Sequence, residues 1–168
     1  MKTHGNHVHQ DETGSVRSQG KTELFDLLRK DHEELRDLFK KIAKSSNKDI
    51  DTRQVLFAQL ERELLNHMEA EERFFYTALE QEEESRSRVL ESYEEHLVAR
   101  TVIGTFTSLA VDDERWPAKL KVLSRLFRQH ADDEEHDLFK LGKKLLSNEQ
   151  FQGIVAKVQE LRRDPRHV

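Results

Sequence analysis

Residues 120–145 read LKVLSRLFRQHADDEEHDLFKLGKKL, and the pattern within them decides the fold. Apolar residues recur at steps of three and four, which is the spacing of one face of an amphipathic α-helix. The predicted inward face consists of Leu120, Leu123, Phe127, His130, Glu134, Leu138, Leu141 and Leu145. This stretch therefore predicts a helix that carries a histidine and a glutamate on its otherwise apolar packing face.

Three other stretches show the same periodicity, at residues 22–44, 51–82 and 85–110. Each carries a histidine on its apolar face, and the second also carries a glutamate one turn later. These polar residues are His32, His67 with Glu71, and His96. The other predicted inward positions are Phe25, Leu28, Leu35, Phe39 and Ile42; Phe57, Leu60, Leu64, Phe74 and Ala78; and Val89, Tyr93, Arg100 and Ile103.

Short polar breaks separate these stretches, with Ser85 as an expected N-cap and Pro117 in the first turn of a helix over 117–146. Ser147 and Gln150 form a capping-box pattern that opens a short fifth helix to about residue 163. Long helices with short connections favour antiparallel neighbours. We therefore expect an all-α, up-down antiparallel four-helix bundle with a short fifth C-terminal helix.

The predicted bundle domain spans residues 21–168, and residues 1–20 are expected to form a flexible, disordered polar tail. The 168 residues suit one domain, and 6 glycines and 2 prolines beside 36% charged residues are typical of a helical protein. The polar N-terminus lacks the apolar segment of a secretory signal, and no apolar run could span a membrane. We expect a cytoplasmic protein that is a monomer or a weak homo-oligomer.

Charge and cysteine content exclude several function classes. The net charge of −5 offers no basic surface for nucleic acid. The absence of cysteine removes disulfides, thiolate zinc sites, iron–sulfur clusters and thiol catalysis. Histidines and carboxylates remain as the residues able to carry chemistry.

The glutamates on the apolar faces need a physical explanation, because glutamate is almost never fully buried unless it is paired or binds a metal. In His67-x-x-x-Glu71 and His130-x-x-x-Glu134, four residues turn about 400° and rise about 6 Å, so each pair shares one face. Imidazole and carboxylate ligands together favour iron, manganese or zinc over calcium. The alternative is that the glutamates pair with Arg100 or a lysine.

The arrangement also repeats within the chain. His32 precedes the first HxxxE pair by 35 residues, and His96 precedes the second by 34. A bundle would place these two halves about a pseudo-twofold axis, with His32 and His67 on one metal ion and His96 and His130 on the other. The two glutamates would bridge the ions, and each ion would keep positions for water or an exogenous molecule.

At these residues the sequence resembles the hemerythrin-like, or HHE cation-binding, domain family over about residues 22–146. The resemblance rests on DHEEL (His32), HMEAE (His67, Glu71), EEHLVAR (His96) and HADDE (His130, Glu134). It implies two non-haem iron ions (Fe2+/Fe3+), oxo- or hydroxo-bridged, in a four-helix bundle. Members of this family include oxygen binders, redox and iron sensors, and proteins that handle nitric oxide or peroxide.

The chain departs from the oxygen-carrying hemerythrins at two positions. They have a second histidine one turn after the third-helix histidine, where this chain has Arg100, and they end in HxxxxD rather than HxxxE. The second bridging carboxylate is therefore either Glu134 or, at the longer spacing, Glu135. These departures favour redox chemistry or iron sensing over reversible oxygen carriage. Arg100 either orients a bridging carboxylate or reaches the bundle surface, and Tyr93 either contacts an exogenous ligand or packs in the core.

The sequence leaves three functions open. The first is a di-iron protein that acts on or senses hydrogen peroxide, O2 or nitric oxide, in oxidative or nitrosative stress or in iron handling. In this reading the partner is a small diatomic or peroxide ligand, and a peroxide- or oxygen-reactive enzyme activity is one form of it. The second is an iron- or oxygen-binding sensor module without turnover. The third is a structural metal site, for example for zinc.

Overall fold

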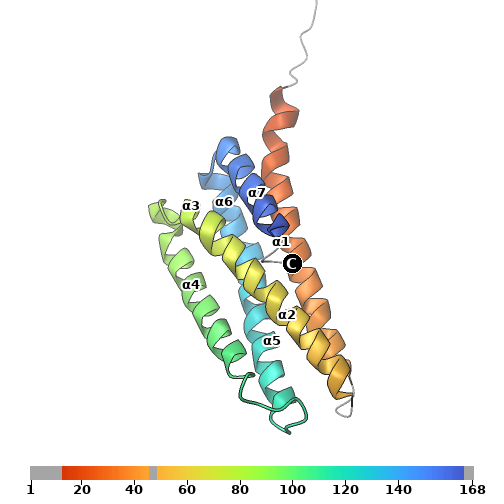
Figure 1. Cartoon of the computed structure of the whole chain (residues 1–168). Coiled ribbons are helices and arrows are strands. Elements are labelled where there is room, and N and C mark those ends of the chain that lie inside the picture. The colour runs from red at the N-terminus through yellow and green to blue at the C-terminus, as the bar shows by residue number, and fades with distance from the viewer. Residues whose placement is uncertain (1–12, 46–48, 165–168) are drawn as a thin grey trace, which may run out of the picture.

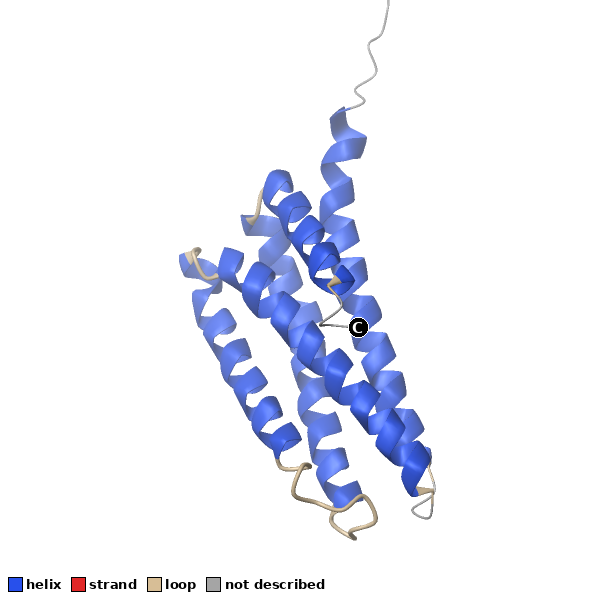
Figure 2. Ribbon diagram, in the orientation of Figure 1, coloured by secondary structure: helices blue, strands red, loops and turns tan. Residues whose placement is uncertain are grey.

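The computed structural model describes residues 13–45 and 49–164, and all regular structure within these ranges is helical (Figure 1; Figure 2). The all-α prediction is confirmed for these residues. The elements are α1 (Thr13–Lys44), α2 (Ile50–Ala70), η1 (Glu71–Tyr76), α3 (Thr77–Leu79), α4 (Glu83–Gly104), α5 (Trp116–Asp133), η2 (Glu134–Leu138), α6 (Phe139–Leu145) and α7 (Asn148–Arg163). None of these described helices combines the length and apolar character of a membrane span.

The long helices α1, α2, α4 and α5 lie side by side, and α7 lies against α1 (Figure 1). Helix α1 packs against α2, α5 and α7, while α4 packs against α5. The α2, η1 and α3 segments follow one another without a break, as do α5, η2 and α6. This arrangement brings residues from four helical paths to one level of the molecule.

The segments η1 and η2 are π-helical turns, and each begins at a glutamate of an HxxxE pair, Glu71 or Glu134. A π-turn closes its hydrogen bond from i to i+5, so it holds one residue more than an α-helical turn. Such turns are frequent at functional sites. Both HxxxE pairs therefore end where their helix changes its register.

The register change makes the predicted inward positions after Glu71 wrong by one residue. Phe74 and Ala78, expected on the packing face, are only half-buried. Phe75 and Leu79 are fully buried in their place, and Tyr76 is buried as well. The second π-turn has the same effect, because Leu141 and Leu145 are half-buried whereas the buried residues are Leu138, Phe139, Gly142 and Leu146.

Two apolar clusters form the core of the described residues, with a polar layer between them. One cluster contains Phe25, Phe75, Phe139 and Phe151 among its members. The other consists of Leu35, Leu38, Phe39, Ile42, Leu60, Leu64, Met68, Ala99, Ile103, Phe106, Trp116, Leu120, Leu123, Phe127 and Ala131. Along α1, His32 lies between residues of the first cluster and residues of the second. Buried apolar area thus stabilises the fold on both sides of the polar layer.

Several predicted boundaries differ from the structure. Residues 13–20, assigned to the tail, are helical, because a packed helix extends by one hydrogen bond per added residue; residues 1–12 lie outside the described residues. The N-cap of α4 is Glu82 rather than Ser85, whose hydroxyl instead donates to the Leu79 carbonyl at 2.6 Å. The capping box at the start of α7 is confirmed.

Gly142 offers a test of how tightly the first cluster is packed. A Cβ at Gly142 would lie 3.1 Å from Cε2 of Phe75 and 3.3 Å from Cζ of Phe25, and both rings are held by further aromatic neighbours. We expect Gly142→Ala to lower the free energy of unfolding by about 1–3 kcal/mol, because two closely packed rings would have to shift to admit the added methyl group. Urea unfolding followed by circular dichroism measures the change.

The matched control is Gly153→Ala in α7, where an added Cβ would meet nothing within 4 Å. Alanine is the better helix former, so this variant should gain about 0.5–1 kcal/mol. Equal effects of the two substitutions would contradict the tight packing around Gly142.

Candidate metal centre

The polar layer contains all six residues singled out as metal ligands, and every one of them is buried. They come from α1, α2, η1, α4, α5 and η2, so the π-turns supply both glutamates. The six residues are His32, His67, Glu71, His96, His130 and Glu134. The structure therefore brings together side chains that are up to 102 positions apart in the sequence.

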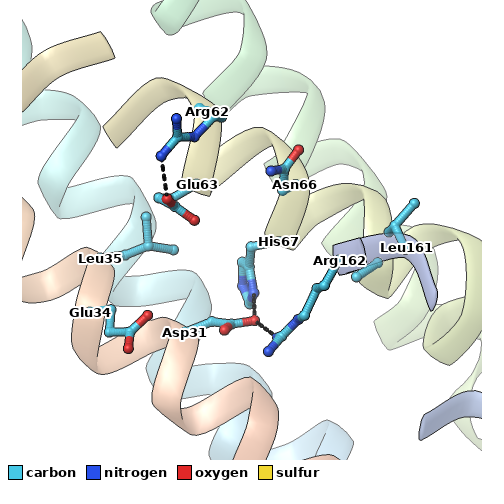
Figure 3. Close-up of a pocket in the computed structure, with 10 residues that line it drawn as sticks. Asp31, Glu34, Leu35, Arg62, Glu63, Asn66, His67, Leu161 and Arg162 are labelled. Carbon is cyan, nitrogen blue, oxygen red and sulfur yellow. Dashed lines mark hydrogen bonds and ion pairs between the residues drawn. The ribbon is translucent and has the colours of Figure 1, made fainter. Parts of the chain in front are cut away.

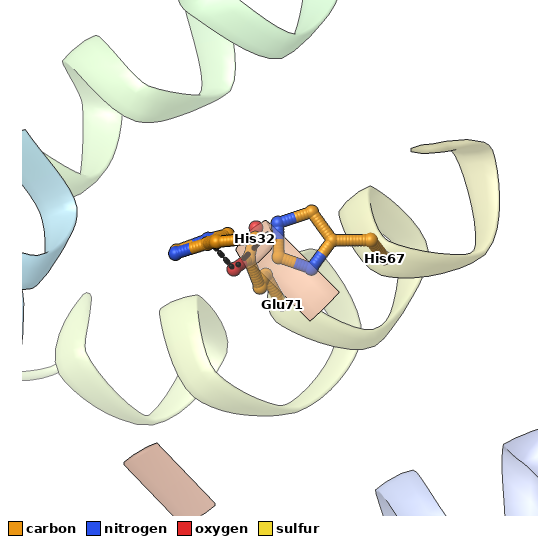
Figure 4. Close-up of side chains that lie close together, drawn as sticks. All are labelled: His32, His67 and Glu71. Carbon is orange, nitrogen blue, oxygen red and sulfur yellow. Dashed lines mark ion pairs between the residues drawn. The ribbon is translucent and has the colours of Figure 1, made fainter. Parts of the chain in front are cut away.

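The first half of the centre consists of His32, His67 and Glu71. The Nε2 atom of His67 lies 3.2 Å from Oε1 of Glu71, and Nε2 of His32 lies 3.8 Å from the same oxygen. Figure 4 shows both imidazole rings turned toward the Glu71 carboxylate. One potential ligand atom from each residue lies within 4.8 Å of the others, which is close enough for the three to share a cation.

The second half consists of His96 and His130 with the other oxygen of Glu71. Nε2 of His96 and Nε2 of His130 lie 3.4 and 3.9 Å from Oε2 of Glu71. The two Nε2 atoms are 3.1 Å apart. Glu71 therefore stands between the halves, with one oxygen facing each histidine pair.

Glu134 is the second carboxylate at the centre. Its Oε2 lies 3.3 Å from Nε2 of His32, and the residue is buried. Glu135 is instead partly exposed and contacts Nδ1 of His32 at 2.9 Å, on the outer side of the ring. Of the two carboxylates that the sequence left open, the structure places Glu134 in the central position.

Several atoms at the centre are buried without a hydrogen-bond partner in the described structure. They are Nε2 of His32, Nε2 of His67, Oε1 of Glu71 and both carboxylate oxygens of Glu134. An unsatisfied buried polar group is destabilising by about 1–3 kcal/mol, so native proteins rarely keep several together. A cation coordinated by these nitrogens and oxygens would satisfy them, and this donor set suits iron, manganese or zinc.

Each of the four histidines has a carboxylate on its outer side, facing Nδ1. The pairs are His130 with Glu95 at 2.7 Å, His96 with Glu72 at 2.8 Å, His32 with Glu135 at 2.9 Å, and His67 with Asp31 at 3.5 Å. An outer carboxylate that accepts from Nδ1–H leaves the Nε2 lone pair free to face a metal ion. These outer carboxylates orient His32, His96 and His130 through hydrogen bonds, while Asp31 lies farther from His67.

The sequence analysis missed Asp31, Glu72 and Glu95 and considered Glu135 only as a bridging carboxylate, although a signal for the outer positions exists. Each is the immediate sequence neighbour of a central residue, as in Asp31–His32, Glu71–Glu72, Glu95–His96 and Glu134–Glu135. These contacts follow the internal repeat. A carboxylate on α1 faces the histidine of α2, as one on α4 faces the histidine of α5. A carboxylate on η1 faces the histidine of α4, as one on η2 faces the histidine of α1. An acidic residue beside four of the six central residues was therefore the visible sign of the outer carboxylates.

Arg100 and Tyr93 lie further from the centre than expected. The Arg100 guanidinium donates to both carboxylate oxygens of Glu72, at 2.6 and 3.0 Å, so it orients an outer carboxylate rather than a central one. The Tyr93 hydroxyl donates to the backbone carbonyl of Glu72 at 3.3 Å. In the described structure, the hydrogen bonds of both side chains thus go to Glu72 and not to the two central glutamates.

Tyr76 also lies at the centre, and the sequence analysis did not identify it. It is fully buried, donates its hydroxyl to Oε2 of Glu71 at 3.3 Å and lies 3.4 Å from Nε2 of His130. The extra residue in the π-turn rotates it inward, so a strict helical period does not find it.

Burial and close charges shift the pKa values of the central groups. Burial would raise the pKa of Glu71, but the charge on His67 and the hydrogen bonds of other imidazoles hold that pKa well below its usual range. Burial and the charge of Glu71 raise the pKa of Glu134. Burial opposes protonation of His130, yet hydrogen bonds with Glu71 and Glu95 raise its pKa to about 10. Without a cation, this layer therefore holds protons.

These shifts predict that loading the site with a metal releases protons. His130, with a pKa of about 10, is protonated at neutral pH and must become neutral to bind a cation. Affinity should therefore rise with pH, because protons compete at low pH. Titration of metal-free protein with Zn2+ in weakly buffered solution, followed with a pH indicator, measures the release. Ca2+, which prefers oxygen ligands, is the control and should release none; zinc binding without proton release would contradict the prediction.

A family model described as the hemerythrin HHE cation binding domain matches residues 23–141. No curated protein and no solved structure gives a match. The matched region contains all six central residues and the four outer carboxylates, and it ends before α7 begins at Asn148.

Proposed function

Because the chain belongs to the hemerythrin HHE cation-binding domain family, we propose that it is a non-haem di-iron protein that reacts with or senses a small oxidant such as hydrogen peroxide, O2 or nitric oxide. One observation carries the proposal. The two oxygens of Glu71 face two different histidine pairs. They do so inside a layer where several buried nitrogen and oxygen atoms have no hydrogen-bond partner in the described structure.

In this proposal the domain spans residues 21–168 as an up-down antiparallel four-helix bundle. His32 and His67 would hold one iron ion, His96 and His130 the other, and Glu71 and Glu134 would lie between them. Bound iron supplies Lewis acidity and one-electron exchange. The outer carboxylates of His32, His96 and His130 would keep these histidines in the tautomer that presents Nε2 to the ion.

A cavity beside the centre supports a small uncharged partner. It has a volume of about 260 Å³, and three of the histidines contribute to its wall. Most of the remaining inner wall is apolar, formed by Leu64, Met68, Val98, Ala99, Leu126 and Phe127. Such a wall admits small neutral molecules and disfavours ions, which lose hydration on entry. Glu91, Glu94 and Glu95 also line the cavity, and their charge would repel anions.

Tyr76 supports chemistry at the centre rather than metal storage alone. Burial and the charges of the central glutamates raise its pKa well above the usual value, so its hydroxyl keeps its proton. That hydroxyl already donates to Glu71, a proposed ligand. The described residues thus hold a fixed hydrogen-bond donor next to the position where an oxidant would react.

Metal analysis of protein purified without chelator tests the proposal, together with stopped-flow mixing of the reduced protein with hydrogen peroxide, O2 or nitric oxide. We expect two iron ions per chain and a spectral change on mixing with at least one of these oxidants. Two zinc ions and no reaction after reconstitution with iron would instead favour a structural site. One ion per chain would contradict the shared-glutamate arrangement.

A further inference from the structure

Helix α7 lies outside the region that matches the family model, yet it contacts the metal-binding part of the molecule. It packs against α1, α2 and η1. The side chains that it buries are Phe151, Ile154, Val155, Val158 and Leu161. Because this apolar face is packed against the other helices, it also sets the position of Arg162, the residue that follows Leu161.

That residue, Arg162, forms an ion pair with Oδ2 of Asp31. The same oxygen lies 3.5 Å from Nδ1 of His67. Figure 3 shows the Asp31 carboxylate between the His67 ring and the Arg162 guanidinium. The three residues line a cavity of about 290 Å³ that is partly polar and open to solvent. Without Arg162, the Asp31 carboxylate would be expected to turn toward the water in this cavity.

The His67 side differs from the other sides of the centre. Arg36 and Arg100 hold the outer carboxylates of His32 and His96, and both arginines lie within the matched region. Asp31 instead pairs with Arg162 on α7. Its distance to Nδ1 of His67 is the longest of the four distances between an outer carboxylate and a histidine. Nδ1 of His67 is also buried without a hydrogen bond in the described structure. The outer carboxylate of His67 is therefore fixed by an arginine outside the matched region, whereas those of His32 and His96 are fixed by arginines within it.

We propose that Arg162 is a positioning residue for the metal ion held by His67. It anchors Asp31 against the imidazole, so the C-terminal helix sets how firmly the His32–His67 half binds its ion. The half formed by His96 and His130 does not depend on α7 in this way. The proposal rests on the two-ion site of the proposed function and makes its two ions unequal.

The test uses full-length protein loaded with two equivalents of Co2+, whose absorption reports the ligands around each ion. Release of Co2+ to excess chelator is followed in the wild-type protein and in Arg162→Met and Asp31→Asn. Loss of an outer partner typically weakens metal binding by about 10- to 100-fold. We expect each variant to release one equivalent faster by about that factor, with the second equivalent released at the wild-type rate. Arg162→Lys, which keeps the charge, should lie in between.

Gln159→Ala is the matched control, since Gln159 donates from α7 to Glu23 of α1 at 3.0 Å without touching a histidine partner. It should release both equivalents like the wild-type protein. Equal acceleration of both equivalents in Arg162→Met, or no acceleration at all, would overturn the proposal. A wild-type protein that takes up fewer than two Co2+ ions would instead contradict the two-ion site itself, so the two failures are distinguishable.

Discussion

Replacing Glu71 with glutamine is expected to remove both metal ions from the protein. Oε1 of Glu71 faces His32 and His67, while Oε2 faces His96 and His130. The substitution keeps the shape of the side chain but removes the negative charge that both ions would share. Because a direct ligand is lost, the affinity of each half should fall by more than the about 10- to 100-fold typical of an outer-shell change.

Metal content after gel filtration, together with Zn2+ titration of the metal-free variant, measures this loss. The matched control is Glu69→Gln, two positions earlier on α2, where the glutamate pairs with Arg73 on the surface. It should bind metal like the wild-type protein. An E71Q variant that keeps one ion at wild-type affinity would show that Glu71 serves only one half of the centre.

Removing the metal with a chelator is expected to lower the free energy of unfolding by several kcal/mol. A ligand that binds only the folded state stabilises it by about 2.7 kcal/mol at 100 times its Kd, so two ions at that excess contribute about 5 kcal/mol. The chelated protein also keeps its partnerless atoms, such as Nε2 of His67 and Oε2 of Glu134, buried between the two apolar clusters.

Urea unfolding of metal-loaded and chelated protein at the same pH measures this difference. In E71Q the two preparations should unfold at nearly the same urea concentration, because there is little metal to remove. Identical midpoints for the two wild-type preparations would mean that the polar layer is stable by itself, and would remove the physical reason for placing ions there.

The sequence predicted the parts of this structure that follow from regular helical spacing. Steps of three and four residues identify the helical faces, and the two HxxxE pairs identify the central glutamates. The expected positions fail where the spacing is not regular. Phe75 and Leu79 replace Phe74 and Ala78 on the buried face because a π-turn begins at Glu71. A π-turn breaks the 3.6-residue period on which these positions were predicted, so a regular pattern does not locate it.

Contacts between helices were harder to predict than positions along one helix. Asp31 and Glu95 precede central histidines, but which histidine each one faces depends on how neighbouring helices are placed. The Arg162 contact joins segments 131 residues apart, and no local pattern connects them. Arg100 illustrates the same limit, because the sequence indicated that it faces inward but did not indicate that Glu72 is its partner.

The paired π-turns also bear on the ancestry of the chain. A π-turn in an otherwise α-helical segment is equivalent to a single inserted residue. Here the extra residue occurs at corresponding positions of the two halves of the chain, each time starting at the glutamate that follows a central histidine by four residues. Two independent insertions at matching positions would be a coincidence. Duplication of one ancestral hairpin that already carried the extra residue accounts for both with a single event.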